Sequence, residues 1–485
     1  MTFEPSAGTG GTSTGAVLRN RPFLLLWLSQ LTTQVGSNMV LFGLTVIVFE
    51  ATNLRSAVSA LFLTFLVPAV LLSAVAGVYI DRVDRRTVLV LTNVFRALAM
   101  VGLFAVGTNV SLILLLNIVV SILTVFFAPA EAAMIPHLVP RNQLVSANGL
   151  FTLTLNGAFA LGFALLGPLI VKISGGPEPL LLAVGVLYAV AAVLCFTLPP
   201  NPPVPGTEEP AHHAVHDAGD AVQGTFAQFA EGIAYIRSNR AIGWSLVYLG
   251  VAASLVGVIG VLGPSFAQVT LGLGAEDLFL VVLPLGIGIV MGVLLLNSYG
   301  RYVPRRRAIE GGLIALGILL ALLTIAGPVS RALQRVQPPI VDLSAVTSLI
   351  AVVIAMAFVA GIAYGVVAIS SQTQLQEDLP PEVRGRVFGV LNMLVSVGSI
   401  LPIIIVGPIS DLIGTTAVIL IVALGVFVLG IVSIVRRGPL APAEELATAG
   451  TMVHGTALDP TGVAMRTEEP EASDGPEEPG PGARA

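Results

Sequence analysis

Charge and cysteine are scarce in this chain of 485 residues. Charged residues make up 11% of it, against about 25% in soluble domains, and hydrophobic residues make up 55%. Because so little charge is available to cover a surface in contact with water, the composition predicts an integral membrane protein. Cys195 is the single cysteine, which excludes an intramolecular disulfide.

Several functional motifs are also missing. The chain contains no GxxxxGK[ST] sequence, which argues against intrinsic ATP-driven transport. A membrane prenyltransferase would need acidic metal-binding clusters, and the nearest match, DRVD at 81–84, is interrupted by arginine. Residues 1–18 have no positive n-region and no cleavage site, so we expect the first apolar segment to act as an uncleaved signal anchor. No cofactor or metal is predicted.

Long apolar runs account for most of the chain, and each is long enough for a helix that crosses a bilayer, which needs about 20 residues. Since lipid requires backbone groups to be satisfied within each span, and alternating ten-residue segments are absent, helices are favoured over a barrel. The predicted fold is an all-α membrane protein with twelve spans. They lie near 23–50, 57–80, 88–107, 110–130, 149–173, 180–198, 242–266, 278–299, 308–327, 344–371, 387–409 and 415–435.

Arginine is distributed unevenly between the two sides of these spans. Lys and Arg concentrate on the cytoplasmic side of membrane proteins, so the sixteen-to-four excess on one side predicts that both termini are cytoplasmic. The richer side holds Arg19, Arg21, Arg82, Arg85, Arg86, Arg141, Arg237, Arg240, Arg301, Arg305, Arg306, Arg307, Arg384, Arg386, Arg436 and Arg437. The other side holds Arg55, Lys172, Arg331 and Arg335.

The two halves of the chain repeat each other. Pro140 recurs as Pro380 and the pair Gly167-Pro168 as Gly407-Pro408, each 240 residues later. Arg85-Arg86 recurs as Arg305-Arg306 after 220 residues. Chance coincidence of Gly and Pro is the alternative, but the three matches together indicate two six-span halves related by duplication, as in transporters that rock about a central site.

Segments outside the spans divide the chain further. Residues 199–225 are rich in Pro, Gly and acid and are typical of a flexible linker. The linker residues His212, His213, His216, Asp217 and Asp220 have the right types for zinc, but nothing rigid would hold them. The predicted segments are a tail at 1–18, a bundle at 19–198, the linker, an amphipathic surface helix at 226–241, a bundle at 242–437 and a tail at 438–485.

The turn GVYIDRVDRR at 77–86 resembles the loop between spans 2 and 3 of the major facilitator superfamily. Gly77, Asp81, Arg82, Arg85 and Arg86 match that loop, whereas Asp84 stands where the family usually has Gly. The strings at 126–150 and 370–394, the second containing Arg384, Gly385 and Arg386, resemble a bacterial exporter branch that includes macrolide-efflux proteins and siderophore exporters. The resemblance extends over residues 19–437.

This resemblance implies a facilitator fold and transport by alternating access, not catalysis. We therefore predict a monomeric, multi-pass protein of the cell membrane that exports a small amphipathic organic compound, drug-like, macrolide-like or siderophore-like, driven by protons. Its partners would be that compound, the lipid bilayer and protons, with no nucleic acid. Gly167-Pro168 resembles the span-5 motif of antiporters, although Gly162 is displaced by one position. An importer, or a receptor or assembly protein on the same fold, is the alternative.

A conformational gate is predicted at the charged turn. The facilitator packing would place Asp81 near the start of span 11, close to Val387, where a helix N-terminus carries partial positive charge. The alternative is that the turn only fixes topology. The predicted gate residues are Gly77, Asp81, Arg82, Arg85, Arg86, Arg384, Gly385 and Arg386.

Arg96 and Glu131 are candidates for proton coupling. Arg96 is the only charge well inside a span, and Glu131 stands at the end of predicted span 4. A charge at that depth costs at least about 2.5 kcal/mol, so Arg96 should face protein or water and have a partner. A structural ion pair and snorkelling of Arg96 to the surface are the alternatives.

Substrate contacts are expected from spans 1, 4, 7 and 10, which the resemblance assigns to the cavity. Polar residues at helical spacing form one stripe on span 1 and another on span 4. These stripes would either line the cavity or hydrogen-bond helices together. The candidates are Gln30, Gln34, Asn38, Asn117, Ser121, Tyr248 and Tyr364.

Overall fold

The computed structural model describes residues 14–80, 82–201, 240–270, 272, 279–299, 303–326, 348–378 and 384–437. In these ranges all regular secondary structure is helical. The predicted linker, surface helix and tails fall almost entirely outside the described residues, so those domain boundaries stay predictions.

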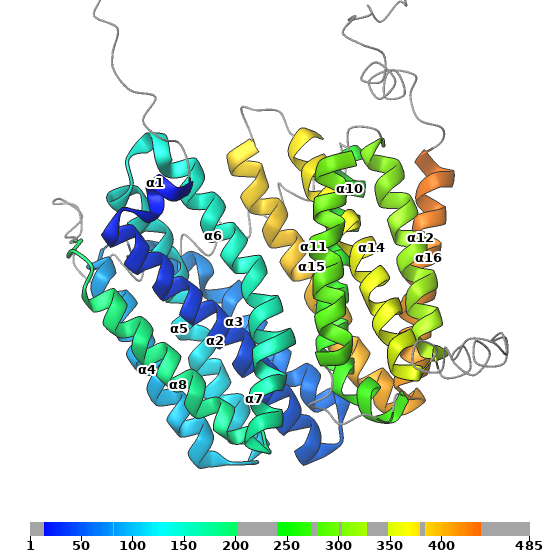
Figure 1. The fold of residues 1–485 in the computed structure, drawn as a ribbon, viewed down its shortest axis with the longest axis horizontal. Coiled ribbons are helices and arrows are strands. Elements are labelled where there is room, and N and C mark those ends of the chain that lie inside the picture. Colours follow the sequence, from blue (N-terminus) through cyan, green and yellow to red (C-terminus); the bar gives the residue numbers. More distant parts are fainter. Residues whose placement is uncertain are drawn as a thin grey trace, which may run out of the picture.

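The N-terminal half forms one bundle (Figure 1). Its fifth span is continuous but changes to a π-helix in the middle, at η2. The elements are α1 (Thr14–Leu18), α2 (Arg21–Thr52), α3 (Arg55–Ile80), α4 (Arg85–Val106), α5 (Val110–Leu138), η1 (Arg141–Gln143), α6 (Leu144–Phe159), η2 (Ala160–Leu166), α7 (Gly167–Ser174) and α8 (Glu178–Phe196).

The C-terminal half forms a second bundle beside the first (Figure 1). Its elements are α10 (Arg240–Ser265), η3 (Phe266–Thr270), α11 (Phe279–Tyr299), α12 (Arg305–Thr324), α14 (Leu349–Asp378), α15 (Arg384–Ile413) and α16 (Thr415–Arg437). Contacts between the bundles join α3 to α15, η2 to α11, and α10 to both α2 and α3.

Each predicted span coincides with a helical segment. Ten described helices are long and apolar enough to cross a membrane, and shorter apolar helices at Leu280–Leu296 and Val397–Ile413 occupy the remaining two positions. The predicted helical membrane fold is thereby confirmed. The fourth span is longer than predicted: α5 continues to Leu138 through Pro129 and Pro136, because neighbouring helices and local adjustments in membrane proteins compensate for the hydrogen bonds that proline removes.

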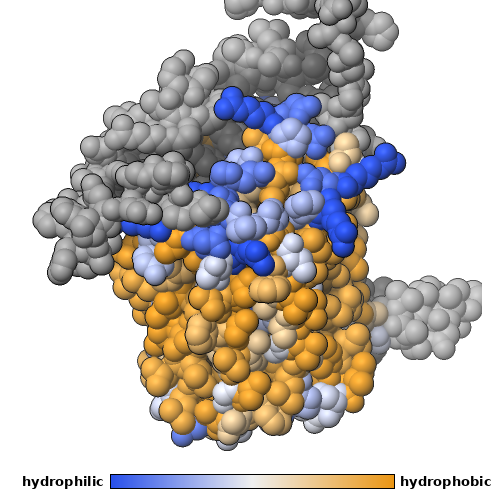
Figure 2. Space-filling view, turned by 90° about the vertical axis from the view of Figure 1, so that its left-hand side faces the viewer, coloured by the Kyte–Doolittle hydropathy of each residue, from blue (hydrophilic) through white to orange (hydrophobic). Residues whose placement is uncertain are grey.

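The face shown in Figure 2 is mostly apolar over its height, and hydrophilic residues collect at one end of it. Outward-facing residues such as Leu98 on α4 and Val186 on α8 are 59% and 63% exposed, which suits contact with lipid. We call the end where α2, α4 and α12 begin the arginine-rich face, since Arg21, Arg85 and Arg305 start those helices. The opposite end, where α3 begins and α15 ends, is the arginine-poor face.

Candidate functional site

A buried charge lies in the core of the N-terminal bundle. Arg96 is 1% exposed and lies about three turns into α4, roughly 16 Å from its start. Its guanidinium carbon is 4.7 Å from the ring centroid of Phe127 and 5.6 Å from that of Tyr188, and its Nη1 donates to Asn93 Oδ1 at 3.4 Å. The side chain is therefore held between two rings by cation–π contacts and does not snorkel to the surface.

Glu131 is the second buried charge of this bundle. It is 6% exposed and, because α5 extends to Leu138, it lies about two turns inside the helix and not at its end as the sequence suggested. Its carboxylate interacts electrostatically with Arg96, but within the described ranges no ion pair of 4 Å or less joins the two. Glu131 Oε1 and the Nε and Nη2 atoms of Arg96 lack a hydrogen-bond partner among the described residues.

Polar groups from α2 and α8 complete this core. Ser29 and Cys195 are hydrogen-bonded at 2.9 Å, and Ser37 bonds the Tyr188 hydroxyl at 2.9 Å. Gln30 is 1% exposed, with Oε1 unpartnered in the described chain. Buried polar groups without partners are costly and call for a specific explanation, and a carboxyl group among them is suited to taking up and releasing a proton. We call this group of residues the polar core.

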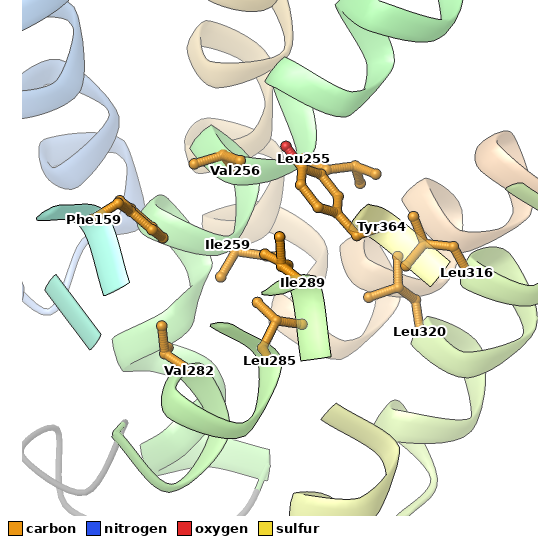
Figure 3. Close-up of a pocket in the computed structure, with 10 residues that line it drawn as sticks. All are labelled: Phe159, Leu255, Val256, Ile259, Val282, Leu285, Ile289, Leu316, Leu320 and Tyr364. Carbon is orange, nitrogen blue, oxygen red and sulfur yellow. The ribbon is translucent and has the colours of Figure 1, made fainter. Parts of the chain in front are cut away.

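An apolar cavity lies in the C-terminal bundle (Figure 3). Two adjoining pockets have empty volumes of about 480 and 700 Å³, counted with the open space at their mouths, and share five lining residues on α10, α11 and α12. Phe159 of α6 reaches the first pocket from the other half. The shared residues are Leu255, Ile259, Val282, Leu285 and Leu320.

Tyr364 is the one lining residue of the cavity with a polar side-chain atom. Its ring lines the first pocket, while its hydroxyl donates to the carbonyl oxygen of Ala252 at 3.2 Å. In Figure 3 this oxygen lies at the upper edge of the group of labelled side chains. The cavity is consequently suited to an apolar molecule or the apolar part of an amphipathic one.

The other predicted substrate residues have different surroundings. Asn117 donates to Leu61 O and to Thr64 Oγ1 at 3.3 and 2.9 Å, and Ser121 donates to Phe65 O at 2.6 Å. These bonds join α5 to α3. Of the two roles considered for the polar stripe on span 4, they correspond to hydrogen bonding between helices.

Tyr248 lies outside the cavity. Its hydroxyl bonds Ser433, whose own hydroxyl donates to Glu310 Oε1 at 2.7 Å, and Arg306 Nε donates to that same oxygen at 2.9 Å. Tyr248 thus belongs to a polar network that joins α10, α12 and α16.

Span 1 divides its polar stripe between two environments. Gln30 is in the polar core, whereas Asn38 packs against Gly162 of η2 and donates its amide to Gln34 O at 2.8 Å. Gln34 is half-buried. The stripe does not reach the apolar cavity, whose lining includes no residue of α2.

The charged turn is tied to neighbouring segments of its own half. Asp84 caps α4 by accepting from the Thr87 amide at 3.1 Å, and its other carboxylate oxygen accepts from the Asn201 amide at 2.8 Å. Arg85 contacts His137 at 3.1 Å, and Arg86 stacks on Phe196 and bonds its carbonyl oxygen. The departure from the family pattern at Asp84 thus forms a cap and a link to the end of span 6.

The hydrogen bonds of Asp84 favour its charged form. Partial burial raises its pKa, but hydrogen bonds from Thr87 and Asn201 outweigh that effect and hold the pKa of Asp84 below its usual value. Each bond favours the charged carboxylate over the neutral acid.

The remaining predicted gate residues are only partly described. Asp81 and the side chains of Arg384 and Arg386 lie outside the described residues, so the contact predicted between Asp81 and span 11 stays a prediction. An added Cβ at Gly77 would meet nothing within 4 Å. Close packing among the described residues therefore does not explain why position 77 is glycine.

Sequence reasoning missed the cavity because it searched for polar residues. Apart from Tyr364 the lining is aliphatic, aromatic or glycine, and such residues also form ordinary helix contacts. Span 7 is rich in apolar residues, as most of the spans are. This composition does not distinguish a helix that lines a cavity from one that is packed closely on all sides.

The sequence is similar to those of known membrane transporters. A family model described as Major Facilitator Superfamily matches residues 26–403. The chain is 23% identical over 428 residues to the multidrug efflux pump Tap of Mycolicibacterium fortuitum, covering 85% of this chain and 95% of the pump. It is 26% identical over 388 residues to an uncharacterized MFS-type transporter of Mycobacterium bovis, covering 78% and 81% of the two chains.

Solved structures show the same fold. The nucleoside transporter NupG superposes with a TM-score of 0.64 at 15% identity, covering 86% of this chain and all of NupG. The POT family transporter PepTSo superposes with a TM-score of 0.60 at 12% identity, covering 88% and 98% of the two chains.

Two packed bundles of apolar helices, with buried charges in both and an apolar cavity in the second, are typical of a multi-pass membrane transporter. The chain belongs to the Major Facilitator Superfamily.

Proposed function

We propose that this transporter is a proton-driven exporter of small, largely apolar organic compounds and works by alternating access. The observation that carries the proposal is the apolar cavity lined by α10, α11, α12, α14, α16 and η3, since small-molecule sites are concave and mostly apolar. The naming of relatives as multidrug efflux pumps supports the same substrate class.

The polar core supplies the proposed coupling site. An ionised Glu131 and Arg96 without full hydrogen bonding are unstable in a protein interior, so a proton on Glu131 would change the stability of this bundle and bias its conformation. The orientation proposed places both termini in the cytoplasm. The arginine distribution supports that orientation.

Transport is tested with Nile red, a neutral lipophilic fluorophore, in cells that lack their own efflux pumps. Expression of this chain is expected to speed loss of the dye several-fold, and a protonophore should remove the effect. Faster uptake would identify an importer, and no change would argue against this substrate class.

Adjacent residues on α11 allow the cavity to be tested with a matched control. Ile289 lines the first pocket, whereas Val290 is 56% exposed to the surroundings. Ile289→Trp is expected to fill the pocket and abolish Nile red efflux, and Val290→Trp should leave it close to normal at equal membrane levels. Equal efflux by both variants would exclude the cavity as the binding site.

Coupling is tested with Glu131→Gln in proteoliposomes with an imposed pH gradient. The variant should let Nile red equilibrate downhill but not concentrate it, because the neutral amide cannot exchange a proton. A variant that still concentrates the dye would rule out Glu131. If Glu131 only neutralises Arg96, Glu131→Gln should misfold and Arg96→Gln should rescue it.

Orientation is tested at the two ends of the fifth span. Ser174 and Asn142 are both exposed and lie at the arginine-poor and arginine-rich faces. In a variant lacking Cys195, cysteine at Ser174 should react with an impermeant thiol reagent outside the cell, and cysteine at Asn142 only from inside. The opposite result would contradict the proposed orientation.

A further inference from the structure

The two halves meet at the arginine-poor face, where α3 begins and α15 ends. Gly407 on α15 has no room for a side chain, since an added Cβ would lie 2.5 Å from Arg55 O and would collide with Ser59 Oγ. Ser59 is 2% exposed and donates to Ile403 O at 2.7 Å. The two helices are therefore in direct contact here.

The carboxylate of Asp411 on α15 closes this junction. Oδ1 accepts from the Arg55 amide at 2.8 Å and Oδ2 accepts from the Ser56 amide at 2.9 Å. These are the first two residues of α3, whose amides have no partner within the helix. The N-terminal cap of a helix in one half is thus supplied by an acidic residue of the other half, where the positive end of the helix dipole favours it.

The Arg55 side chain extends the junction toward two further helices. Its Nη1 is 3.7 Å from Asp411 Oδ1, and its Nε donates to Ser265 Oγ at 2.8 Å. Ser265 in turn bonds Thr415 Oγ1 at 2.7 Å. Below this polar layer, Phe62 of α3 contacts Gly260 of α10 so closely that a side chain at Gly260 would collide with the ring.

We infer that Asp411 is the gating residue of the arginine-poor face: its bond to the start of α3 holds this face closed and is released when the face opens. The inference rests on the proposed alternating-access cycle, in which the halves separate at each face in turn. Because α3 and α15 belong to different halves, the cap cannot survive that separation. The position equivalent to Asp411 in the first half, 240 residues earlier, is Val171, so the duplicated half has no matching carboxylate.

The test measures the reactivity of a cysteine buried under this junction. Ser59→Cys in a Cys195→Ala background replaces one small buried group with another, and its reaction with a maleimide is timed in detergent micelles. Asp411→Ala is expected to raise the rate about tenfold or more, because hydrogen bonds to a charged group are lost. Asp411→Asn, which retains one acceptor oxygen, should give a smaller increase and serves if the alanine variant does not fold.

Two variants separate capping from the ion pair of Asp411 with the Arg55 side chain. Arg55→Ala leaves the amides capped and should raise the rate less than Asp411→Ala does. Glu178→Ala removes an acid from the first turn of α8 at the same face and should have no effect. An unchanged rate with Asp411→Ala, or an equal rise with Glu178→Ala, would overturn the inference.

General loosening of the fold is monitored with Cys195 of α8, which lies in the polar core and is 0% exposed. In a chain that retains Cys195 and no introduced cysteine, Asp411→Ala should leave its reaction with N-ethylmaleimide unchanged. A parallel rise at both sites would contradict a specific gate. The assay needs no substrate, proton gradient or sidedness, so the gate and the proposed export can fail independently.

Discussion

In each half the second span packs against the fourth, α3 against α5 in the first half and α11 against α14 in the second. Equivalent positions meet in both pairs, but the contacts differ in kind. Displacing Ser121 by 240 positions reaches Gly361, and displacing Phe65 by 220 reaches Leu285. In the first half Ser121 donates to Phe65 O at 2.6 Å. In the second half a Cβ on Gly361 would collide with Leu285 O. A hydroxyl bridges the helices in one half, and glycine allows direct backbone contact in the other.

This difference extends along both helix pairs. Asn117 adds two more bonds from α5 to α3, whereas its equivalent, Ala357, is buried in an apolar cluster with Val281. Close contact between α11 and α14 continues at Gly288 and Gly365, where side chains would meet backbone oxygens. Polar side chains thus join the second and fourth spans of the first half, whereas the equivalent spans of the second half meet through glycine and line an apolar cavity.

The largest expected effect comes from adding one methyl group at the glycine contact. Gly361→Ala should lower the free energy of unfolding by about 2–3 kcal/mol, because a backbone oxygen cannot move aside as a side chain can. Unfolding in mixed micelles by SDS titration measures it. Gly425→Ala, where an added Cβ meets nothing within 4 Å, is the control, and equal stability of the two variants would contradict the contact.

The sequence predicted the helices better than their contacts. Length and hydrophobicity located twelve spans, and the repeated Pro and Gly-Pro positions aligned the halves at the offsets that superpose Ser121 on Gly361. The fourth span was too short in the prediction, which ended it near residue 130, where the apolar run ends; α5 continues through Pro136 to Leu138. Whether Asn117 faced a cavity or α3 depended on helix rotation, which the spacing of polar residues does not determine.

The gate illustrates the same limit. The sequence drew attention to Asp81 at the end of α3 and to the start of α15. The same reasoning at the opposite ends of these two helices would have paired Asp411 with the start of α3. The residues near Asp411 do not resemble the family motif around Asp81, so pattern matching pointed only to the Asp81 end of these helices. The packing of α3 against α15 allows an acidic residue of one helix to cap the other at either end.

A smaller effect is expected from the polar contact of the first half. Asn117→Ala and Thr64→Val should each destabilise the protein, and the double variant should show a coupling free energy of about 0.6–1.7 kcal/mol, as for other hydrogen bonds between membrane helices. Unfolding in mixed micelles measures the cycle. Strictly additive effects would show that Asn117 stabilises α5 through Leu61 O alone or through packing.

The smallest expected effect is at the caps of the third spans. Displacing Asp84 by 220 positions reaches Pro304, and both residues precede the first turn of their helix. Asp84 accepts from the Thr87 amide, whereas no side-chain cap bond is present at Pro304. Of these two described caps, the one at Asp84 is therefore the one whose strength depends on pH.

The sign of that dependence follows from the lowered pKa of Asp84. A group whose pKa is lower in the folded protein adds stability above its unfolded value, about 3.9 for Asp, and loses it as the pH falls through the folded pKa. Asp84→Asn, which keeps an acceptor without charge, should therefore melt below the unmodified protein at pH 7, and the gap should close as the pH falls below about 4. Arg305→Gln beside Pro304 controls for charge changes at the arginine-rich face. A melting difference that persists unchanged at low pH would mean that Asp84 acts through hydrogen-bond geometry alone, and the two caps would then differ in shape and not in charge.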